Sequence, residues 1–337
     1  MIYFFSYIII ISIANYYIKK KNYILSNTGF NHQTYVNKST PLSGGIFLLL
    51  PILNLFFLNH LMFSIILILI FFLGLLSDLN ILSSARKRFI IQILLILFFV
   101  FVVKLEVLPT RIEMVDVLFE NKYLSYFFTL FCLMVLLNGS NFIDGLNGLL
   151  LGYILIVFFI LTKLDVLSSI NLSDKKILFL ISSFSFLFIL NFLNKLFMGD
   201  SGAYSLGFLL GYSLIEIYNQ NIFISPYFII LLLWYPCFEN LFSIIRKIYS
   251  TKNPLNPDND HLHHYLFSFL KIKFNFSNYL TNIFASILIN IFNLAVLFYA
   301  STDVNNTMHQ LYIMIFSILI YLITYFSLKK ITKKIIS

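Results

Sequence analysis

Charged residues are scarce in this chain: Asp, Glu, Lys and Arg make up only 11% of its 337 residues. A soluble globular protein usually carries about 25%. Hydrophobic residues make up 60%, and the mean hydropathy is +0.90. A water-soluble fold of this composition would expose large apolar patches. The composition therefore argues against an ordinary soluble protein and predicts an integral membrane protein.

Cysteine and the common nucleotide-binding loops are also in short supply. The two cysteines, Cys132 and Cys237, lie within apolar runs, which favours neither a disulfide framework nor a thiolate metal site. No Walker-type glycine loop or Rossmann fingerprint is present, which argues against a classical nucleotide-binding domain. The first apolar run ends at Lys19-Lys20-Lys21 and has no signal-peptide features before it, so we expect a retained helix.

Long apolar runs are what the chain does have. A transmembrane helix needs about 20 predominantly apolar residues. The candidate runs are residues 2–18, 43–59, 61–76, 89–103, 123–138, 145–161, 177–193, 202–218, 222–243, 278–300 and 309–327. These eleven runs predict an all-α, polytopic helix bundle that forms one domain over residues 1–337. The longest polar stretch, 246–276, is expected to form a small cytoplasmic subdomain of loop and helix.

The basic residues predict how the bundle is oriented. With eleven spans, the loops fall into two sets, one with 17 of the 23 Lys and Arg residues and the other with 6. Basic residues collect on the cytoplasmic side of a membrane. The richer set is therefore expected in the cytoplasm, with a periplasmic N-terminus, and it suits contact with anionic lipid headgroups. Because topology explains most of the basic residues, no nucleic-acid partner is expected.

Five short polar segments interrupt the apolar texture, and all five fall on the predicted cytoplasmic side. They are residues 40–45, 76–79, 138–148, 197–202 and 257–264. A transport site would more naturally lie near the bilayer midplane. A cluster at one membrane surface favours chemistry between a soluble substrate and a lipid headgroup. A transporter, a flippase and a lipid phosphatase remain less favoured alternatives.

The carboxylates in these segments each have a structural alternative. Asp78 ends an apolar run, where a carboxylate is often merely solvated. Asp200 directly precedes an apolar run and is either a helix N-cap or a metal ligand. Asp144 lies between Asn141 and Asn147, which are spaced like residues on one helical face. Residues 138–148 contain more Asn and Asp than a helix cap needs, which favours a functional site.

Histidine is concentrated in the last segment. His261, His263 and His264 are three of the six histidines in the chain. Imidazoles can bind metal, and they can hydrogen-bond phosphate oxygens. Carboxylates together with phosphate groups suit Mg²⁺, and fixed donors can offset charge that develops during phosphoryl transfer. The set of residues is therefore coherent for a reaction between two phosphate-bearing substrates.

Taken in order, the five segments resemble the polyprenyl-phosphate N-acetylhexosamine-1-phosphate transferase family, which also includes phospho-N-acetylmuramoyl-pentapeptide transferase. The resemblance runs from about residue 31 to residue 264. It implies a multi-pass transferase of the bacterial inner (cytoplasmic) membrane, with its active site on the cytoplasmic face. The implied substrates are a UDP-N-acetylhexosamine and undecaprenyl phosphate, with Mg²⁺ as cofactor and Mn²⁺ as the alternative. The resemblance leaves open whether the protein is a homodimer.

The resemblance also implies site residues. The implied catalytic residues are Asp78, Asp144 and Asp200, with Asp200 and Asp78 as metal ligands. The implied substrate-binding residues are Lys38, Arg88, Asn141, Asn147, Arg246, His261, His263 and His264. Leu262 interrupts the histidines, as in the branch that starts O-antigen and related polysaccharides. The peptidoglycan branch has three consecutive histidines, and we rank it lower.

Two positions depart from the family pattern. Ser77 stands where many members have the first Asp of an Asp-Asp pair, and Asn147 stands where many have a second Asp. A lipid phosphate is already ionised near neutral pH, so direct attack needs no base, and we favour a single displacement. A two-step route through an aspartyl-phosphate and a catalytically inactive relative both remain open.

Overall fold

The computed structural model describes residues 2–23, 40–56, 60–107, 109–170, 173–251, 253–254 and 258–336. Across these residues the chain folds into helices and forms no β-strand. The α-helices are α1 (Ile2–Lys20), α2 (Gly44–Phe56), α3 (Leu61–Asp78), α4 (Ala85–Val103), α5 (Glu113–Phe119), α6 (Lys122–Ile143), α7 (Leu149–Lys163), α8 (Asp174–Phe192), α9 (Gly199–Gln220), α10 (Pro226–Leu232), α11 (Trp234–Tyr249), α12 (Leu262–Phe274), α13 (Asn278–Ala300) and α14 (Thr307–Ile336). A short 3₁₀ helix (Leu167–Ile170) precedes α8. The all-α class predicted from composition is confirmed.

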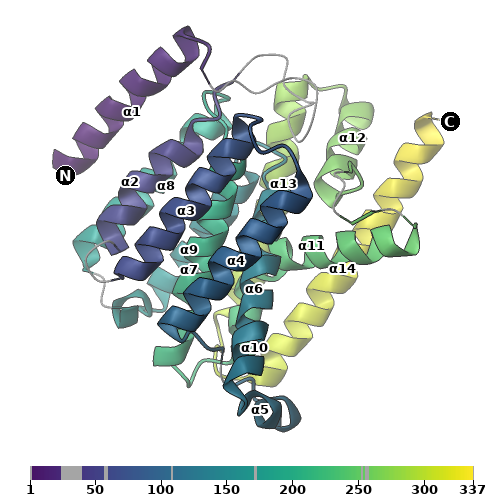
Figure 1. Cartoon of the computed structure of the whole chain (residues 1–337). Helices are drawn as coiled ribbons and strands as arrows, with labels where there is room; N and C mark the ends of the chain where they lie inside the picture. Colours follow the sequence, from purple (N-terminus) through teal and green to yellow (C-terminus); the bar gives the residue numbers. More distant parts are fainter. Residues whose placement is uncertain are drawn as a thin grey trace.

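Each apolar run predicted from the sequence contains helix, but one of them is not a single helix. The run at 222–243 is divided between α10 and α11, which meet at an angle of 76°. Pro236 lies in the first turn of α11, where a residue without an N–H cannot continue the hydrogen bonding of a preceding helix. The prediction of one continuous helix at 222–243 is therefore wrong. α11 instead runs across the bundle (Figure 1).

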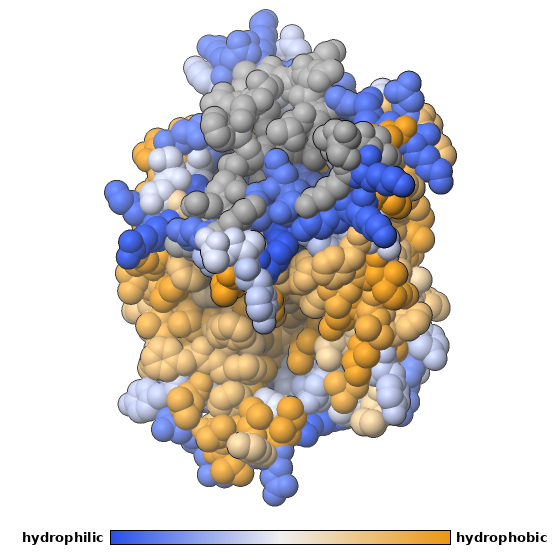
Figure 2. All heavy atoms as spheres, turned by 90° about the vertical axis from the view of Figure 1, so that its right-hand side faces the viewer, coloured by the Kyte–Doolittle hydropathy of each residue, from blue (hydrophilic) through white to orange (hydrophobic). Residues whose placement is uncertain are grey.

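Five helices in the described ranges are long and apolar enough to cross a membrane by length and composition: α3, α6, α8, α13 and α14. The bent pair α10 and α11 raises the number to six if it counts as one span. Figure 2 shows a hydrophobic belt between two more hydrophilic ends. The chain is therefore a multi-pass membrane protein, while the eleven spans and their orientation remain predictions.

Helix α9 lies at the centre of the bundle and fixes the position of the site. Every residue from 201 to 215 is buried, and the helix packs against α2, α3 and α6. A helix enclosed in this way has little freedom to shift, because protein interiors are close-packed. The first turn of α9, which carries Asp200, is consequently held in place by the core.

Candidate active site

Polar segments far apart in the sequence meet at the N-terminal end of α9. The backbone N–H of Phe197 donates to the carbonyl of Pro41 at 2.8 Å, and Gly44 N–H donates back to the Phe197 carbonyl at 2.9 Å. Gly45 N–H donates to the Met198 carbonyl at 3.2 Å. The segments 40–45 and 197–202 are thus joined by backbone hydrogen bonds, as their predicted convergence requires.

Asp78 caps the N-terminus of α9. Its Oδ1 accepts from the backbone N–H of Asp200 at 2.8 Å, and its Oδ2 accepts from the Ser201 N–H at 3.1 Å and the Ser201 hydroxyl at 2.7 Å. A carboxylate here satisfies orphan N–H groups and complements the positive end of the helix. Gly199 makes the approach possible: its φ is +69°, and a Cβ there would lie 2.6 Å from Asp78 Oδ2.

This capping role bears on the predicted metal ligation by Asp78. Both of its carboxylate oxygens are already used by α9, so the structure gives a reason to treat Asp78 as a positioning group. Asp78 remains part of the site, because it holds the turn that carries Asp200. Its ligation of metal remains a prediction that the hydrogen bonding does not favour.

Ser77 bridges Asp200 and Arg88. The Ser77 hydroxyl donates to Asp200 Oδ2 at 2.6 Å, and Arg88 donates to the same hydroxyl oxygen. The Arg88 Nη1 atom lies 3.7 Å from Asp200 Oδ2. A carboxylate at position 77 would place a further negative charge against Asp200. The serine therefore gives a neutral link between the acidic and basic groups.

Asp144 follows α6 as its C-cap and completes an acidic cluster. Burial raises the pKa of Asp144 well above its ordinary value, and the negative charges of Asp200 and Asp78 raise it further, against a lowering backbone hydrogen bond with Gly199. Like charges held together in this way favour binding of a cation. In the described part of the chain, no group of three His, Cys, Asp or Glu side chains has the arrangement of a metal site. A Mg²⁺ bound largely by substrate phosphates and water needs only one or two carboxylates from the protein.

Asn147 is buried and hydrogen-bonded to other parts of the fold. Its side chain is 4% exposed, and its Nδ2 donates to Asn194 Oδ1 at 3.0 Å. Its backbone N–H donates to Asn282 Oδ1 at 2.8 Å. The next residue, Gly148, donates to Asn191 Oδ1 at 2.6 Å. The structure thus points to a role for Asn147 in holding the turn after Asp144, in place of the predicted substrate contact.

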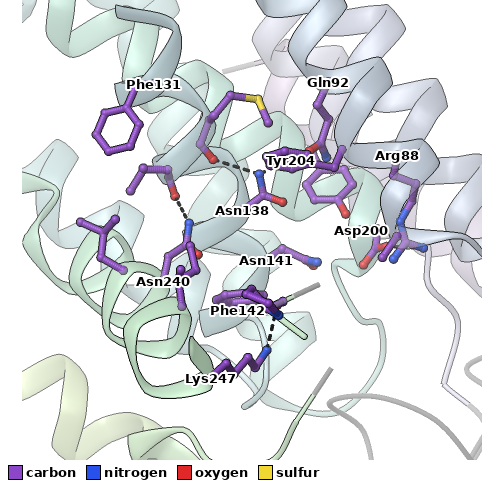
Figure 3. Close-up of a pocket in the computed structure, with 17 residues that line it drawn as sticks. Arg88, Gln92, Phe131, Asn138, Asn141, Phe142, Asp200, Tyr204, Asn240 and Lys247 are labelled. Atoms are coloured by element: carbon purple, nitrogen blue, oxygen red, sulfur yellow. Dashed lines mark hydrogen bonds and ion pairs between the residues drawn. The ribbon is translucent and has the colours of Figure 1, made fainter. Parts of the chain in front are cut away.

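A cavity of about 340 Å³ lies beside the acidic cluster, between α4, α6, α11 and the first turns of α9 (Figure 3). Three predicted site residues line it: Arg88, Asn141 and Asp200. Its other polar lining residues are Gln92, Asn138, Tyr204, Asn240 and Lys247. Its main apolar lining residues are Phe89, Phe131, Met134, Val135, Leu241 and Ile244. Part of the cavity wall is therefore polar, and the rest is formed by apolar side chains.

One of these additional residues, Tyr204, could have been predicted from the sequence. Tyr204 is four residues after Asp200, which places both on one face of α9. Asn138 belongs to a segment already identified as polar, although its own role was not predicted. Nothing comparable marks Asn240 or Lys247, because their exposure to the cavity depends on the bend before α11.

Arg246 and Lys247 differ in what they face. Arg246 Nη2 lies 2.8 Å from Asp258 Oδ2, and its Nη1 donates to the Tyr325 hydroxyl at 2.9 Å. Arg246 is not among the residues that line the cavity, whereas Lys247 is. Lys247 is therefore better placed than Arg246 for the substrate-binding role that was predicted for Arg246. Arg246 instead anchors the loop that carries Asp258.

His261 is held between two carboxylates. Its Nδ1 lies 2.9 Å from Glu239 Oε1, and its Nε2 lies 3.3 Å from Asp258 Oδ1. Burial lowers the pKa of His261, but Asp258 and Glu239 outweigh this effect and raise the pKa above its ordinary value. Glu239, which is 1% exposed, also accepts hydrogen bonds from the Leu262 N–H and the Tyr321 hydroxyl. Sequence reasoning missed Glu239.

The other predicted histidines are buried next to the end of α6. A Cβ at Gly145 would collide with Nε2 of His263, which places this ring directly against the segment of Asp144. The His261 ring lies 5.3 Å from the ring of Phe142, measured between centroids. His263 and His264 are 0% and 3% exposed. The histidines thus pack against the residues on either side of Asp144, but they do not line the cavity. The predicted residue Lys38 lies outside the described residues.

Comparison with known proteins points to the same region of the chain. The model of glycosyl transferase family 4 matches residues 60–218, a region that contains Asp78, Asp144 and Asp200. The chain is similar to this family over nearly half of its length. The match also covers all the cavity-lining residues of α4, α6 and α9.

The similar proteins carry more than one kind of name. A Bacillus subtilis protein named as a probable undecaprenyl-phosphate N-acetylglucosaminyl 1-phosphate transferase is 34% identical over 45% of this chain and 43% of its own length. A phospho-N-acetylmuramoyl-pentapeptide-transferase of Prochlorococcus marinus is 30% identical over 58% of this chain and 57% of its own length. An undecaprenyl-phosphate alpha-N-acetylglucosaminyl 1-phosphate transferase of Thermotoga maritima is 29% identical over 67% of this chain and 68% of its own length. The chain thus matches about half the length of the first two relatives.

Proposed function

We propose that the protein transfers an N-acetylhexosamine-1-phosphate from a UDP-sugar to undecaprenyl phosphate and releases UMP. The observation that carries this proposal is the position of Asp144, Asp200 and Arg88 beside a cavity with polar and apolar walls. The names of the similar proteins support the same type of reaction. The product would start a cell-envelope polysaccharide such as O-antigen.

The apolar wall of the cavity suits the lipid substrate. Phe131, Met134 and Val135 come from α6, and Leu241 and Ile244 come from α11. Contact with these side chains would shield the first part of a polyprenyl chain from water. Its phosphate would then lie near Arg88 and Lys247, whose positive charges line the same cavity. The bend at α11 matters here, because it turns this wall across the bundle.

The polar wall suits the nucleotide sugar. Asn141 points into the cavity between Asp200 and Lys247 (Figure 3). An amide can donate to and accept from hydroxyl and carbonyl groups of a uridine or an amino sugar. The histidine segment is packed behind this wall through Phe142 and Gly145. We therefore assign the donor to the side of the cavity formed by the end of α6.

The chemistry we propose is a single displacement. An ionised oxygen of the lipid phosphate attacks the β-phosphorus of the UDP-sugar, a new P–O bond forms, and the bond to UMP breaks. No proton has to be removed from the attacking oxygen, so Ser77, a poor base, does not prevent reaction. The full use of the Asp78 oxygens by α9 makes that carboxylate a less suitable nucleophile for a two-step route.

Residues of the acidic cluster fit a divalent cation. We propose that Asp200 and Asp144 hold Mg²⁺, or Mn²⁺ in its place, which would neutralise charge on the substrate phosphates when bound. Asp78 keeps Asp200 in position, and Arg88 would stabilise the negative charge of a phosphate oxygen. The protein would act in the bacterial inner membrane, with the site facing the cytoplasm.

The direct test is a transfer assay with the full-length protein in membranes. Undecaprenyl phosphate and Mg²⁺ are supplied with UDP-N-acetylglucosamine, UDP-N-acetylgalactosamine, a UDP-6-deoxy amino sugar or UDP-N-acetylmuramoyl-pentapeptide. We expect a lipid-linked amino sugar diphosphate from one of the first three donors. Product from the pentapeptide donor alone would assign the protein to peptidoglycan synthesis. Absence of product with all four would identify an inactive relative.

A further inference from the structure

Tyr204 occupies a position in the cavity that none of the reaction chemistry described so far uses. It is 2% exposed and lines the cavity one turn after Asp200. Its hydroxyl lies in the electrostatic field of Asp200, Arg88 and Asp78. Figure 3 shows it between Arg88 and Asn138. A buried hydroxyl needs a hydrogen-bond partner, because burying it without one is costly.

Gln92 lies next to this hydroxyl and has a donor to spare. Its side chain is 1% exposed, and its Oε1 accepts from Asn138 Nδ2 at 3.3 Å. Gln92 interacts with the Tyr204 hydroxyl, yet within the described ranges its Nε2 completes no hydrogen bond of normal geometry. Buried amide groups in native proteins are usually satisfied by protein, water or ligand. The hydrogen bond from Asn138 fixes the Gln92 amide with its oxygen toward Asn138. The amide nitrogen, Nε2, can therefore donate to a further acceptor.

The charges around these two donors favour an anionic acceptor. Arg88 and Lys247 line the cavity as cations, and Asp200 is the carboxylate that lines it with them. Ser77 separates Arg88 from Asp200 and accepts only one of the guanidinium donors. Arg88 therefore retains donors for a second group. Lys247 is also paired with Asp258 at 4.0 Å, so the remaining Arg88 donors are the groups that most favour an anionic ligand.

We propose that the Tyr204 hydroxyl and Gln92 Nε2 donate hydrogen bonds to a phosphate oxygen of a bound substrate, beside Arg88. This inference rests on the proposed function, since it concerns the same cavity. The phosphate belongs either to the polyprenyl phosphate or to the nucleotide sugar, because both present the same kind of oxygen. Tyr204 is thereby a substrate-binding residue, and Gln92 both binds the substrate and orients the tyrosine hydroxyl.

The test uses Tyr204→Phe, which removes one oxygen and keeps the ring. Tyr212→Phe is the matched control, because Tyr212 lies two turns further along α9, and its hydroxyl contacts His60 Nδ1 at 2.8 Å outside the cavity. Equilibrium binding to the full-length, detergent-purified protein is measured with farnesyl phosphate, farnesol and UDP-N-acetylglucosamine. Gln92→Met provides a second variant that keeps most of the side-chain volume.

We expect Tyr204→Phe to raise the Kd of a phosphate-bearing ligand about tenfold or more, as the loss of a hydrogen bond to a charged group implies. Farnesol binding and the Tyr212→Phe control should stay unchanged. A selective loss for farnesyl phosphate identifies the lipid as the source, and a selective loss for UDP-N-acetylglucosamine identifies the nucleotide. Gln92→Met should weaken the same ligand.

Several results would overturn the inference. They are unchanged binding of both phosphate ligands to Tyr204→Phe, an equal loss for farnesol, and failure of the unsubstituted protein to bind either phosphate ligand. The transfer reaction is assayed on the same preparation. Phosphate-dependent binding without transfer would overturn the proposed function alone, and transfer with unchanged Tyr204→Phe binding would overturn this inference alone.

Discussion

The Ser77 hydroxyl donates a 2.6 Å hydrogen bond to Asp200 Oδ2 and at the same time accepts one from Arg88. This contact sets the distance between a carboxylate and a guanidinium that both line the cavity. A serine can serve both groups because a hydroxyl donates one hydrogen bond and accepts others. The departure from the family pattern at position 77 therefore leaves a connected site.

Ser77→Ala should lower the transfer rate by at most about tenfold, or roughly 1.4 kcal/mol of barrier, because serine positions Arg88 and Asp200 without acting as a base. Asp78→Ala should cost on the order of 10²-fold or more, because it removes the cap that holds the Asp200 turn. Initial rates at saturating lipid give the comparison. Equal losses in the two variants would mean that Ser77 takes part directly in the chemistry.

Ser77→Asp also tests the link between Ser77, Asp200 and Arg88, by adding a carboxylate in place of removing the hydroxyl. The new carboxylate would pair with Arg88 and repel Asp200, so we expect no gain in rate over the unsubstituted protein. A protein that transfers no sugar until Ser77→Asp is introduced would instead be an inactive relative. Thermal unfolding in detergent serves as the control for a folding defect.

Asp200→Asn should abolish transfer while the protein stays folded and inserted. The amide retains the size of the carboxylate but loses the charge that we assign to Mg²⁺ binding. Transfer rates are measured over a series of Mg²⁺ concentrations, with Asp260→Asn as a carboxylate control away from the cavity. Near-normal activity with the same Mg²⁺ dependence would refute the assignment of Asp200.

The sequence predicted well which segments of the chain prefer lipid to water. A long apolar run shows this preference directly. For that reason the helices lie where the apolar runs predict them. The break between α10 and α11 was missed because a window of apolar residues does not register the effect of Pro236. The spacing of the five polar segments predicted their convergence, since helices that fold back and forth return to the same end.

Orientation within the site was harder to predict. Consecutive residues on a helix point about 100° apart, so only one of two neighbouring basic residues faces a given cavity. Lys247 lines the cavity and Arg246 does not, although both lie within 4.0 Å of Asp258. Glu239 was missed for a similar reason: its partners His261 and Tyr321 come from distant segments that only tertiary packing brings together.

Topology can be tested with single cysteines at positions 253 and 305. Asn305 belongs to the loop between α13 and α14, at the end of the bundle where Arg111 binds its carbonyl (Figure 1). Residue 253 belongs to the loop between α11 and α12 at the end that carries the site. In a variant with Cys132→Ala and Cys237→Ala, an impermeant thiol reagent should reach the two positions from opposite sides, the first from the cytoplasm. Labelling of both from one side would contradict the eleven-span prediction.

The pair of His261 and Asp258 should give stability a defined dependence on pH. The pKa of His261 is raised in the folded protein, so its contribution is fully present below the ordinary histidine pKa and is lost as pH rises through the raised value. The pKa of Asp258 is held well below its usual range, because His261, Arg246 and Lys247 outweigh the raising effect of burial. Its contribution is present above the ordinary Asp pKa and is lost as pH falls through the lowered one. The pair should therefore stabilise most between about pH 4 and about pH 6.5.

Asp258→Asn removes one member of this pair and is compared with Asp260→Asn, a neighbouring carboxylate whose Oδ1 accepts from the Tyr265 hydroxyl. We expect the loss of thermal stability in Asp258→Asn to be largest between about pH 5 and about pH 6.5, and to become smaller as pH rises and His261 loses its charge. A residual loss should persist at high pH, because Arg246 stays charged and has lost its carboxylate partner. The measurement is the apparent Tm in detergent from pH 5 to pH 9, together with the NMR titration of His261. A loss that is constant over this range, with an unchanged His261 pKa in Asp258→Asn, would show that Asp258 does not control the charge of the histidine.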